Sequence, residues 1–169
     1  MNLEEAIKTA LEYENQVRDV YFQEADKLKS PIAKKIFANL GDEEQGHVDY
    51  LNHKLKEWQD TGKVTVEKLD TIVPDQAVID ANVKNLKKNP ASTILDEEID
   101  SFKKALELET KTSNYYKSLL QDLPKENRSL FDRFVEIEEG HKAIVQAELV
   151  NARGLGYWFD FQEFNLEAG

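Results

Sequence analysis

The sequence of 169 residues contains no cysteine, and this absence excludes several kinds of site at once. Without thiolates the chain cannot form disulfides, cysteine-ligated zinc sites, iron–sulfur clusters or a cysteine nucleophile. Long apolar runs are missing too, since no stretch approaches the roughly 20 apolar residues that a helix needs to cross a bilayer. The first residues lack the basic and apolar regions of a signal peptide, so we expect a cytoplasmic protein.

Basic residues are few relative to acidic ones. The chain has 22 Lys and Arg against 33 Asp and Glu, which gives a formal net charge of −11 at pH 7. A protein of this charge repels phosphate backbones and anionic lipid headgroups, so we expect neither nucleic acid nor membrane as a partner. The hydrophobic share of 40% is typical of a globular chain, and the length predicts a single domain over residues 1–169.

Glycine and proline are also scarce, with 7 and 4 residues, and several of them mark helix ends. Asn2 and Glu5 have the spacing of a capping box, Ser30 precedes a proline at a first helical position, and Gly62 is suited to end a helix. The predicted helices span residues 3–29, 31–60, 93–123 and 124–152, with a connection over 61–92 that includes a short helix at 75–87, and an aromatic tail over 153–169.

Two short turns and one long connection determine how these helices can pack. Short turns make the helices of each pair antiparallel neighbours, and the long link allows a crossover between the pairs. We therefore predict an all-α fold, a ferritin-like antiparallel four-helix bundle made of two helix hairpins.

The two halves of the sequence resemble each other. The segment 10–14 reads ALEYE and is echoed by ALELE at 105–109. Likewise EQGH at 44–47 is echoed by EEGH at 138–141. Such self-similarity predicts two copies of one hairpin that face each other across a pseudo-twofold axis.

Each predicted helix carries one glutamate in the middle of its apolar face, and two helices add a histidine three residues later, on the same face. Four buried carboxylates without compensation would cost several kcal/mol apiece. Two divalent cations would neutralise them, and carboxylate with imidazole suits iron or manganese, and zinc as well. The sequence therefore predicts a dinuclear metal site with the ligands Glu14, Glu44, His47, Glu109, Glu138 and His141.

His47 has two candidate partners on its own helix, Glu43 four residues back and Glu44 three residues back. In the second copy the residue four back from the histidine is Ile137, whereas a glutamate stands three back. The repeat therefore favours Glu44. The acidic residues two positions before the ligands of the first and third helices, and the unmatched third histidine, are expected at the surface: Glu12, Glu107 and His53.

With these motifs the sequence resembles the rubrerythrin-like branch of the ferritin-like di-iron carboxylate proteins. The resemblance covers the whole bundle and implies two iron ions. It implies carboxylate ligands at Glu14 and Glu109, bridging carboxylates at Glu44 and Glu138, one imidazole for each iron at His47 and His141, and hydrogen bonds to ligand carboxylates from Tyr21 and Tyr116.

The resemblance also implies a function. A protein of this type would reduce hydrogen peroxide or dioxygen, and we expect a homodimer or small homo-oligomer. Typical rubrerythrins carry a rubredoxin-like domain with four cysteines, so here the electrons would come from an external donor. The family has a further glutamate where this chain has Thr112. The alternatives are a ferroxidase or iron-handling protein, and a helical interaction module whose metal is structural.

Overall fold

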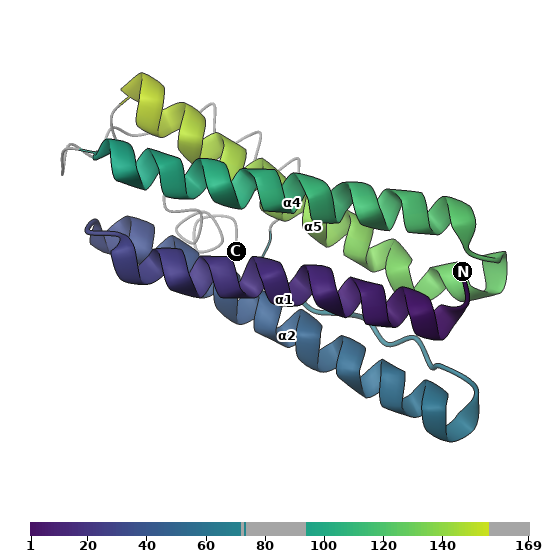
Figure 1. Ribbon diagram of the computed structural model, residues 1–169. Coiled ribbons are helices and arrows are strands. Elements are labelled where there is room, and N and C mark those ends of the chain that lie inside the picture. Colours follow the sequence, from purple (N-terminus) through teal and green to yellow (C-terminus); the bar gives the residue numbers. More distant parts are fainter. Residues whose placement is uncertain (72, 74–93, 156–169) are drawn as a thin grey trace.

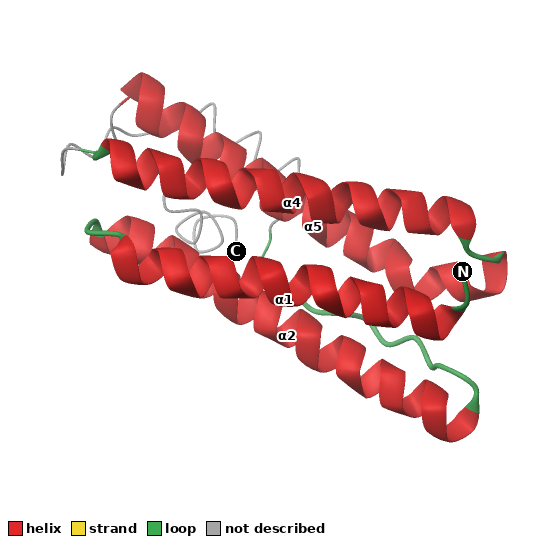
Figure 2. Cartoon of the chain, in the orientation of Figure 1, coloured by secondary structure: helices red, strands yellow, loops and turns green. Residues whose placement is uncertain are grey.

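The computed structural model describes residues 1–71, 73 and 94–155. Four helices make up most of these residues: α1 (Leu3–Lys27), α2 (Pro31–Thr61), α4 (Asp96–Asp122) and α5 (Lys125–Leu155). Figure 1 shows two antiparallel hairpins, α1 with α2 and α4 with α5, lying side by side with α1 next to α4. Within the described ranges there is no strand (Figure 2), and the predicted all-α four-helix bundle is confirmed.

Two of the predicted segments lie outside the described residues. These are the short helix expected at 75–87 and the aromatic tail after residue 155. Of the helices that the structure does describe, none is long and apolar enough to cross a membrane.

The predicted start and stop signals act as expected in the first hairpin. Asn2 Oδ1 accepts a hydrogen bond from the Glu5 amide at 2.8 Å, and the Asn2 amide donates to Glu5 Oε2 at 3.1 Å, which completes a capping box. Ser30 caps α2 by accepting from the Ala33 amide. Gly62 follows α2 with φ of +68°, a left-handed conformation that glycine adopts at little cost.

Several helix ends differ from the prediction by two or three residues. Helix α1 ends at Lys27 instead of 29 because Leu28 is extended and places its side chain in the core. Helix α4 begins at Asp96 instead of 93, where Glu98 Oε1 accepts from the Leu95 amide at 3.3 Å.

Helix α5 does not end before the predicted stop at Gly154 but continues to Leu155. A glycine inside a helix costs only about 1 kcal/mol relative to alanine. Leu149 and Ala152 are buried in the core one turn earlier, and their packing holds this end of the helix.

The long connection runs back along the bundle after α2 (Figure 1). The Tyr50 hydroxyl of α2 donates to the carbonyl oxygen of Glu67 at 3.1 Å, and Arg133 Nε of α5 donates to the carbonyl oxygen of Leu69 at 3.3 Å. These contacts fix residues 62–71 against both α2 and α5.

The apolar core is divided into two clusters, one toward each end of the bundle. One cluster packs Phe37 against Tyr21 and Phe102, and the other packs Tyr116 against Phe131 and Phe134. Between the two clusters, each helix contributes a fully buried glutamate. The fold thus surrounds a charged layer with apolar side chains above and below.

Substitution of Phe37 by alanine should show how strongly the bundle depends on these clusters. Phe37 is fully buried, with its ring centroid 5.2 Å from that of Tyr21 and 4.5 Å from that of Phe102. Removing a buried phenylalanine ring costs about 3–5 kcal/mol, so urea unfolding of Phe37→Ala should show a loss of that size. The control Val150→Ala removes an exposed side chain and should leave the free energy of unfolding nearly unchanged. An equal effect of both variants would contradict this core assignment.

Candidate metal centre

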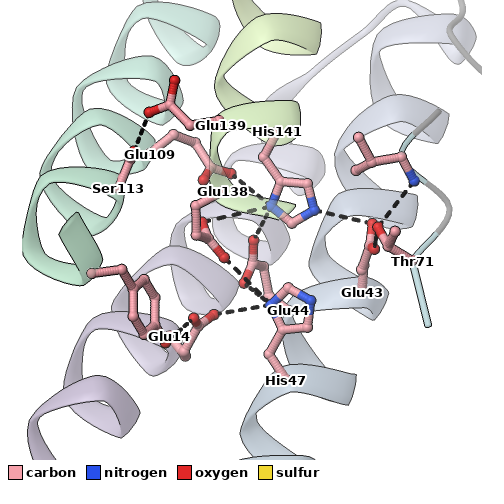
Figure 3. A network of polar contacts seen from close by, with 12 residues as sticks. Glu14, Glu43, Glu44, His47, Thr71, Glu109, Ser113, Glu138, Glu139 and His141 are labelled. Atoms are coloured by element: carbon pink, nitrogen blue, oxygen red, sulfur yellow. Dashed lines mark hydrogen bonds and ion pairs between the residues drawn. The ribbon is translucent and has the colours of Figure 1, made fainter. Parts of the chain in front are cut away.

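The six predicted ligand residues converge in the middle of the bundle (Figure 3). They come from all four helices, and each is at most 1% exposed. Their heptad-like spacing explains this placement, because each lies on the face that its helix turns to the bundle axis. The residues are Glu14 from α1, Glu44 and His47 from α2, Glu109 from α4, and Glu138 and His141 from α5.

The ligand atoms form two overlapping groups. Within each group, one carboxylate or imidazole atom per residue lies within 4.8 Å of the others. Both groups contain Glu44 and Glu138, so these two carboxylates lie where two ions could share them. The groups are Glu14, Glu44, His47 and Glu138, and Glu44, Glu109, Glu138 and His141.

Both imidazoles turn Nδ1 toward the carboxylates. His47 Nδ1 lies 3.1 Å from Glu44 Oε2 and 3.2 Å from Glu14 Oε2. His141 Nδ1 lies 2.7 Å from Glu44 Oε1 and 3.6 Å from Glu109 Oε1. The two rings are nearly parallel, with centroids 5.5 Å apart. The arrangement therefore supplies one imidazole nitrogen to each half of the carboxylate cluster.

Two buried tyrosines hydrogen-bond to the cluster in a crossed pattern. Tyr116 of α4 donates to Glu14 Oε1 of α1 at 2.5 Å, and Tyr21 of α1 donates to Glu109 Oε1 of α4. Each hydroxyl thus reaches the carboxylate of the opposite hairpin. This exchange ties α1 to α4 at the level of the centre and follows the pseudo-twofold repeat.

The donor set fits metal ions. In the described part of the chain, both oxygens of Glu138 and Oε2 of Glu109 are buried without a hydrogen-bond partner. A buried polar atom without a partner costs about 1–3 kcal/mol, and a charged one costs more. Cations placed among these oxygens would remove that cost, so the buried carboxylates and imidazoles could form a metal site.

Protons take up part of the negative charge in the metal-free protein. Burial, together with repulsion from Glu138 and Glu44, raises the pKa of Glu14 and of Glu109 well above the ordinary value. Burial opposes a charge on the two imidazoles, but the surrounding carboxylates outweigh it and raise the pKa of both histidines well above 6.5. Metal binding must therefore displace protons from the centre.

Glu43 also belongs to the site, although the repeat led us to choose Glu44 over it. Its side chain is 6% exposed, and its Oε2 lies 3.0 Å from His141 Nε2, on the side away from the carboxylate cluster. Burial opposes the ionisation of Glu43, but His141 and the hydroxyl of Thr71 outweigh it and lower the pKa of this carboxyl. Glu43, His47 and His141 form a third group of atoms within 4.8 Å of one another.

Nothing in the sequence pattern predicts the contact between Glu43 and His141. The two residues lie on different hairpins, and the position of Glu43 in the second copy is occupied by Ile137. The outward-facing assignments agree with the structure, since Glu12, Glu107 and His53 are all exposed.

A cavity of about 690 Å³ adjoins the centre. It lies between α2 and residues 68–71 of the connection, and both Glu43 and His47 line it. Small molecules and ions can therefore come close to the buried cluster from this side.

Comparison with protein family models, with curated proteins and with solved structures found no match to this chain. The geometry of the site therefore carries the functional argument.

The metal-free protein should lose stability as the pH rises. The two imidazoles have raised pKa values in the folded state, so the stability that they contribute is complete below about pH 6.5 and is lost as the pH passes their folded pKa values. Glu14 and Glu109 act in the same direction, because the folded protein holds protons that the unfolded chain releases. Urea unfolding of the chelator-treated protein should give a lower free energy of unfolding at pH 8.5 than at pH 6.5.

Zinc-loaded protein should show the opposite trend, since deprotonated ligands bind the metal more tightly. The control His53→Gln removes an exposed imidazole outside the centre. Its free energy of unfolding should depend on pH as that of the wild type does. A metal-free protein that becomes more stable between pH 6.5 and 8.5 would contradict this interpretation.

Proposed function

We propose that this chain is a dinuclear-iron oxidoreductase of the rubrerythrin type, which reduces hydrogen peroxide or dioxygen with electrons from an external donor. The observation that supports it most strongly is the pair of buried ligand groups that share Glu44 and Glu138. Four carboxylates with two imidazoles form a harder donor set than the thiolate and histidine sets typical of structural zinc.

The residues divide naturally between two ions. Glu14 and His47 would hold one iron, Glu109 and His141 would hold the other, and the two shared carboxylates would bridge them. When bound, such a pair supplies two electrons for reductive cleavage of an O–O bond. These 169 residues contain no cysteine, so an electron-donating iron–sulfur or rubredoxin centre would have to lie outside them.

The surrounding residues orient the ligands and limit access. The hydroxyls of Tyr21 and Tyr116 fix the orientation of Glu109 and Glu14. The apolar clusters on both sides bury the carboxylate layer, and a buried environment strengthens electrostatic interactions. The cavity beside His47 gives a small oxidant an approach to this layer.

Ferroxidase or iron-handling activity is the second candidate, and the same cavity supports it. Asp42, Glu43 and Asp70 line the cavity together with one lysine, Lys68. A cavity with an excess of carboxylates raises the local concentration of cations. Thr112 is buried in α4 at the position where rubrerythrins have a further glutamate. This difference from the peroxide-reducing family also favours the second candidate.

Stopped-flow oxidation separates the two candidates. The protein is loaded anaerobically with ferrous iron and mixed with hydrogen peroxide or with dioxygen at equal concentration. We expect two irons per chain and a faster reaction with peroxide. A faster reaction with dioxygen would identify a ferroxidase or oxidase instead. Glu44→Gln removes a shared carboxylate and should lower the bound iron, whereas the exposed Glu12→Gln should not. A wild-type protein that binds no iron would refute both candidates.

The tyrosine hydroxyls should matter for the tuning of the centre more than for its assembly. Tyr116→Phe removes the donor at Glu14 Oε1, so the variant should still bind two irons but lose about 10–100-fold in metal affinity or in oxidation rate. Tyr115→Phe is a matched control, because the Tyr115 hydroxyl donates to the backbone oxygen of Ala6, outside the centre. Equal effects of the two substitutions would show that Tyr116 has no specific role.

A further inference from the structure

The two imidazoles of the centre differ in what their outer nitrogens, Nε2, contact. Both turn Nδ1 to the carboxylates, and Figure 3 shows that both outer nitrogens face the side on which Glu43 and Thr71 lie. His141 Nε2 lies 3.0 Å from Glu43 Oε2. His47 Nε2 is buried and has no hydrogen-bond partner among the described residues. The pseudo-twofold symmetry of the ligands therefore does not extend to what lies behind them.

A carboxylate behind a histidine fixes which nitrogen carries the proton. Glu43 accepts a hydrogen bond, so Nε2 of His141 must be the N–H donor, and the lone pair of the neutral ring lies on Nδ1. Nδ1 is the atom that points into the carboxylate cluster, 2.7 Å from Glu44 Oε1. The Glu43 contact therefore holds His141 in the tautomer and ring orientation that metal binding needs, and no described residue acts on His47 Nε2 in this way.

Glu43 is itself held in place by the connection between the hairpins. The hydroxyl of Thr71 donates to Glu43 Oε1, and Thr71 Oγ1 accepts from the Val73 amide at 3.0 Å. The connection thus orients the carboxylate, and the carboxylate orients the imidazole. The residue that corresponds to Glu43 in the second copy of the repeat is Ile137, whose side chain cannot accept a hydrogen bond.

Both imidazoles are buried, but they differ in their position relative to the cavity. His47 lines the cavity of about 690 Å³, together with Glu43, whereas His141 does not line it. An ion held by His47 would therefore lie closer to the route by which ions and small molecules arrive and leave.

We propose that Glu43 is a positioning residue that makes the two metal positions unequal, so that the ion at His141 binds first and more tightly and the ion at His47 binds second and exchanges. This inference rests on the proposed dinuclear centre and adds an order of loading to it. Partners of this kind behind a ligating histidine are worth about 10–100-fold in metal affinity.

Titration of the full-length, metal-free protein with cobalt(II) tests the proposal, with visible absorption and a competing chelator to resolve the steps. The wild type should bind two ions in two steps of different affinity. His47→Gln should keep the tighter step, and His141→Gln should lose it. In Glu43→Gln the tighter step should weaken about 10–100-fold while the weaker step and the total of two ions stay unchanged.

Two further variants make the result specific. Thr71→Val removes the hydroxyl that orients Glu43 and should weaken the same step by a smaller factor, without any change at a ligand. Glu12→Gln makes the same chemical change at an exposed position of α1, outside the cavity and the centre, and should leave both steps intact. A merely structural role of Glu43 would weaken both binding steps alike. Unfolding of the metal-free variants is therefore measured in parallel, to show whether a variant has lost stability.

The outcomes separate this inference from the proposed function. A wild type that binds no cobalt would refute the dinuclear centre itself. Two ions bound in steps of equal affinity, or a Glu43→Gln variant with both steps weakened equally or neither weakened, would overturn the positioning role and leave the centre in place. Three ions in the wild type and two in Glu43→Gln would identify Glu43 as a ligand in the third group of donors and would also overturn it.

Discussion

The structure depends on the confinement of four carboxylates in one buried layer. Each is fully buried, and their mutual repulsion and desolvation raise the pKa of Glu14 and Glu109. Apolar side chains lie on both sides of the layer, so protons or cations are needed to offset the buried charge. The histidines lie within the layer and the tyrosines donate into it from the clusters above and below. The stability of the bundle and the chemistry of the centre therefore both depend on how this buried negative charge is offset.

Both hairpins contribute the same kinds of residue to this layer. Each hairpin brings one mid-helix glutamate and one Glu-x-x-His pair, and each sends a tyrosine hydroxyl to the carboxylate of the other hairpin. Because the hydrogen bonds cross, neither hairpin has a complete set of ligand contacts alone. The packing of α1 against α4 therefore brings each tyrosine hydroxyl to its carboxylate partner.

Helical periodicity was enough to predict the four helices and the six residues that converge, because these depend on spacing within each helix. The role of these residues as metal ligands stays a prediction. Contacts between segments were not accessible in the same way. The crossing of Tyr21 and Tyr116 and the contact of Glu43 with His141 both depend on how the hairpins pair. The hydroxyl of Thr71 reaches Glu43 because the connection returns to this level. Helix ends shifted where a single packed side chain, such as Leu28, outweighed a local signal.

The connection also makes the surroundings of the two repeated glycines, Gly46 and Gly140, different. A Cβ atom at Gly140, next to His141, would overlap with Val73 of the connection. At Gly46, its counterpart next to His47, a Cβ would meet no atom of the described residues within 4 Å. The connection therefore covers the second copy of the motif closely and leaves the first copy facing the cavity, which Gly46 lines. The ligands repeat symmetrically, but their surroundings do not, since the glycine beside His141 lies against Val73 and the glycine beside His47 borders the cavity.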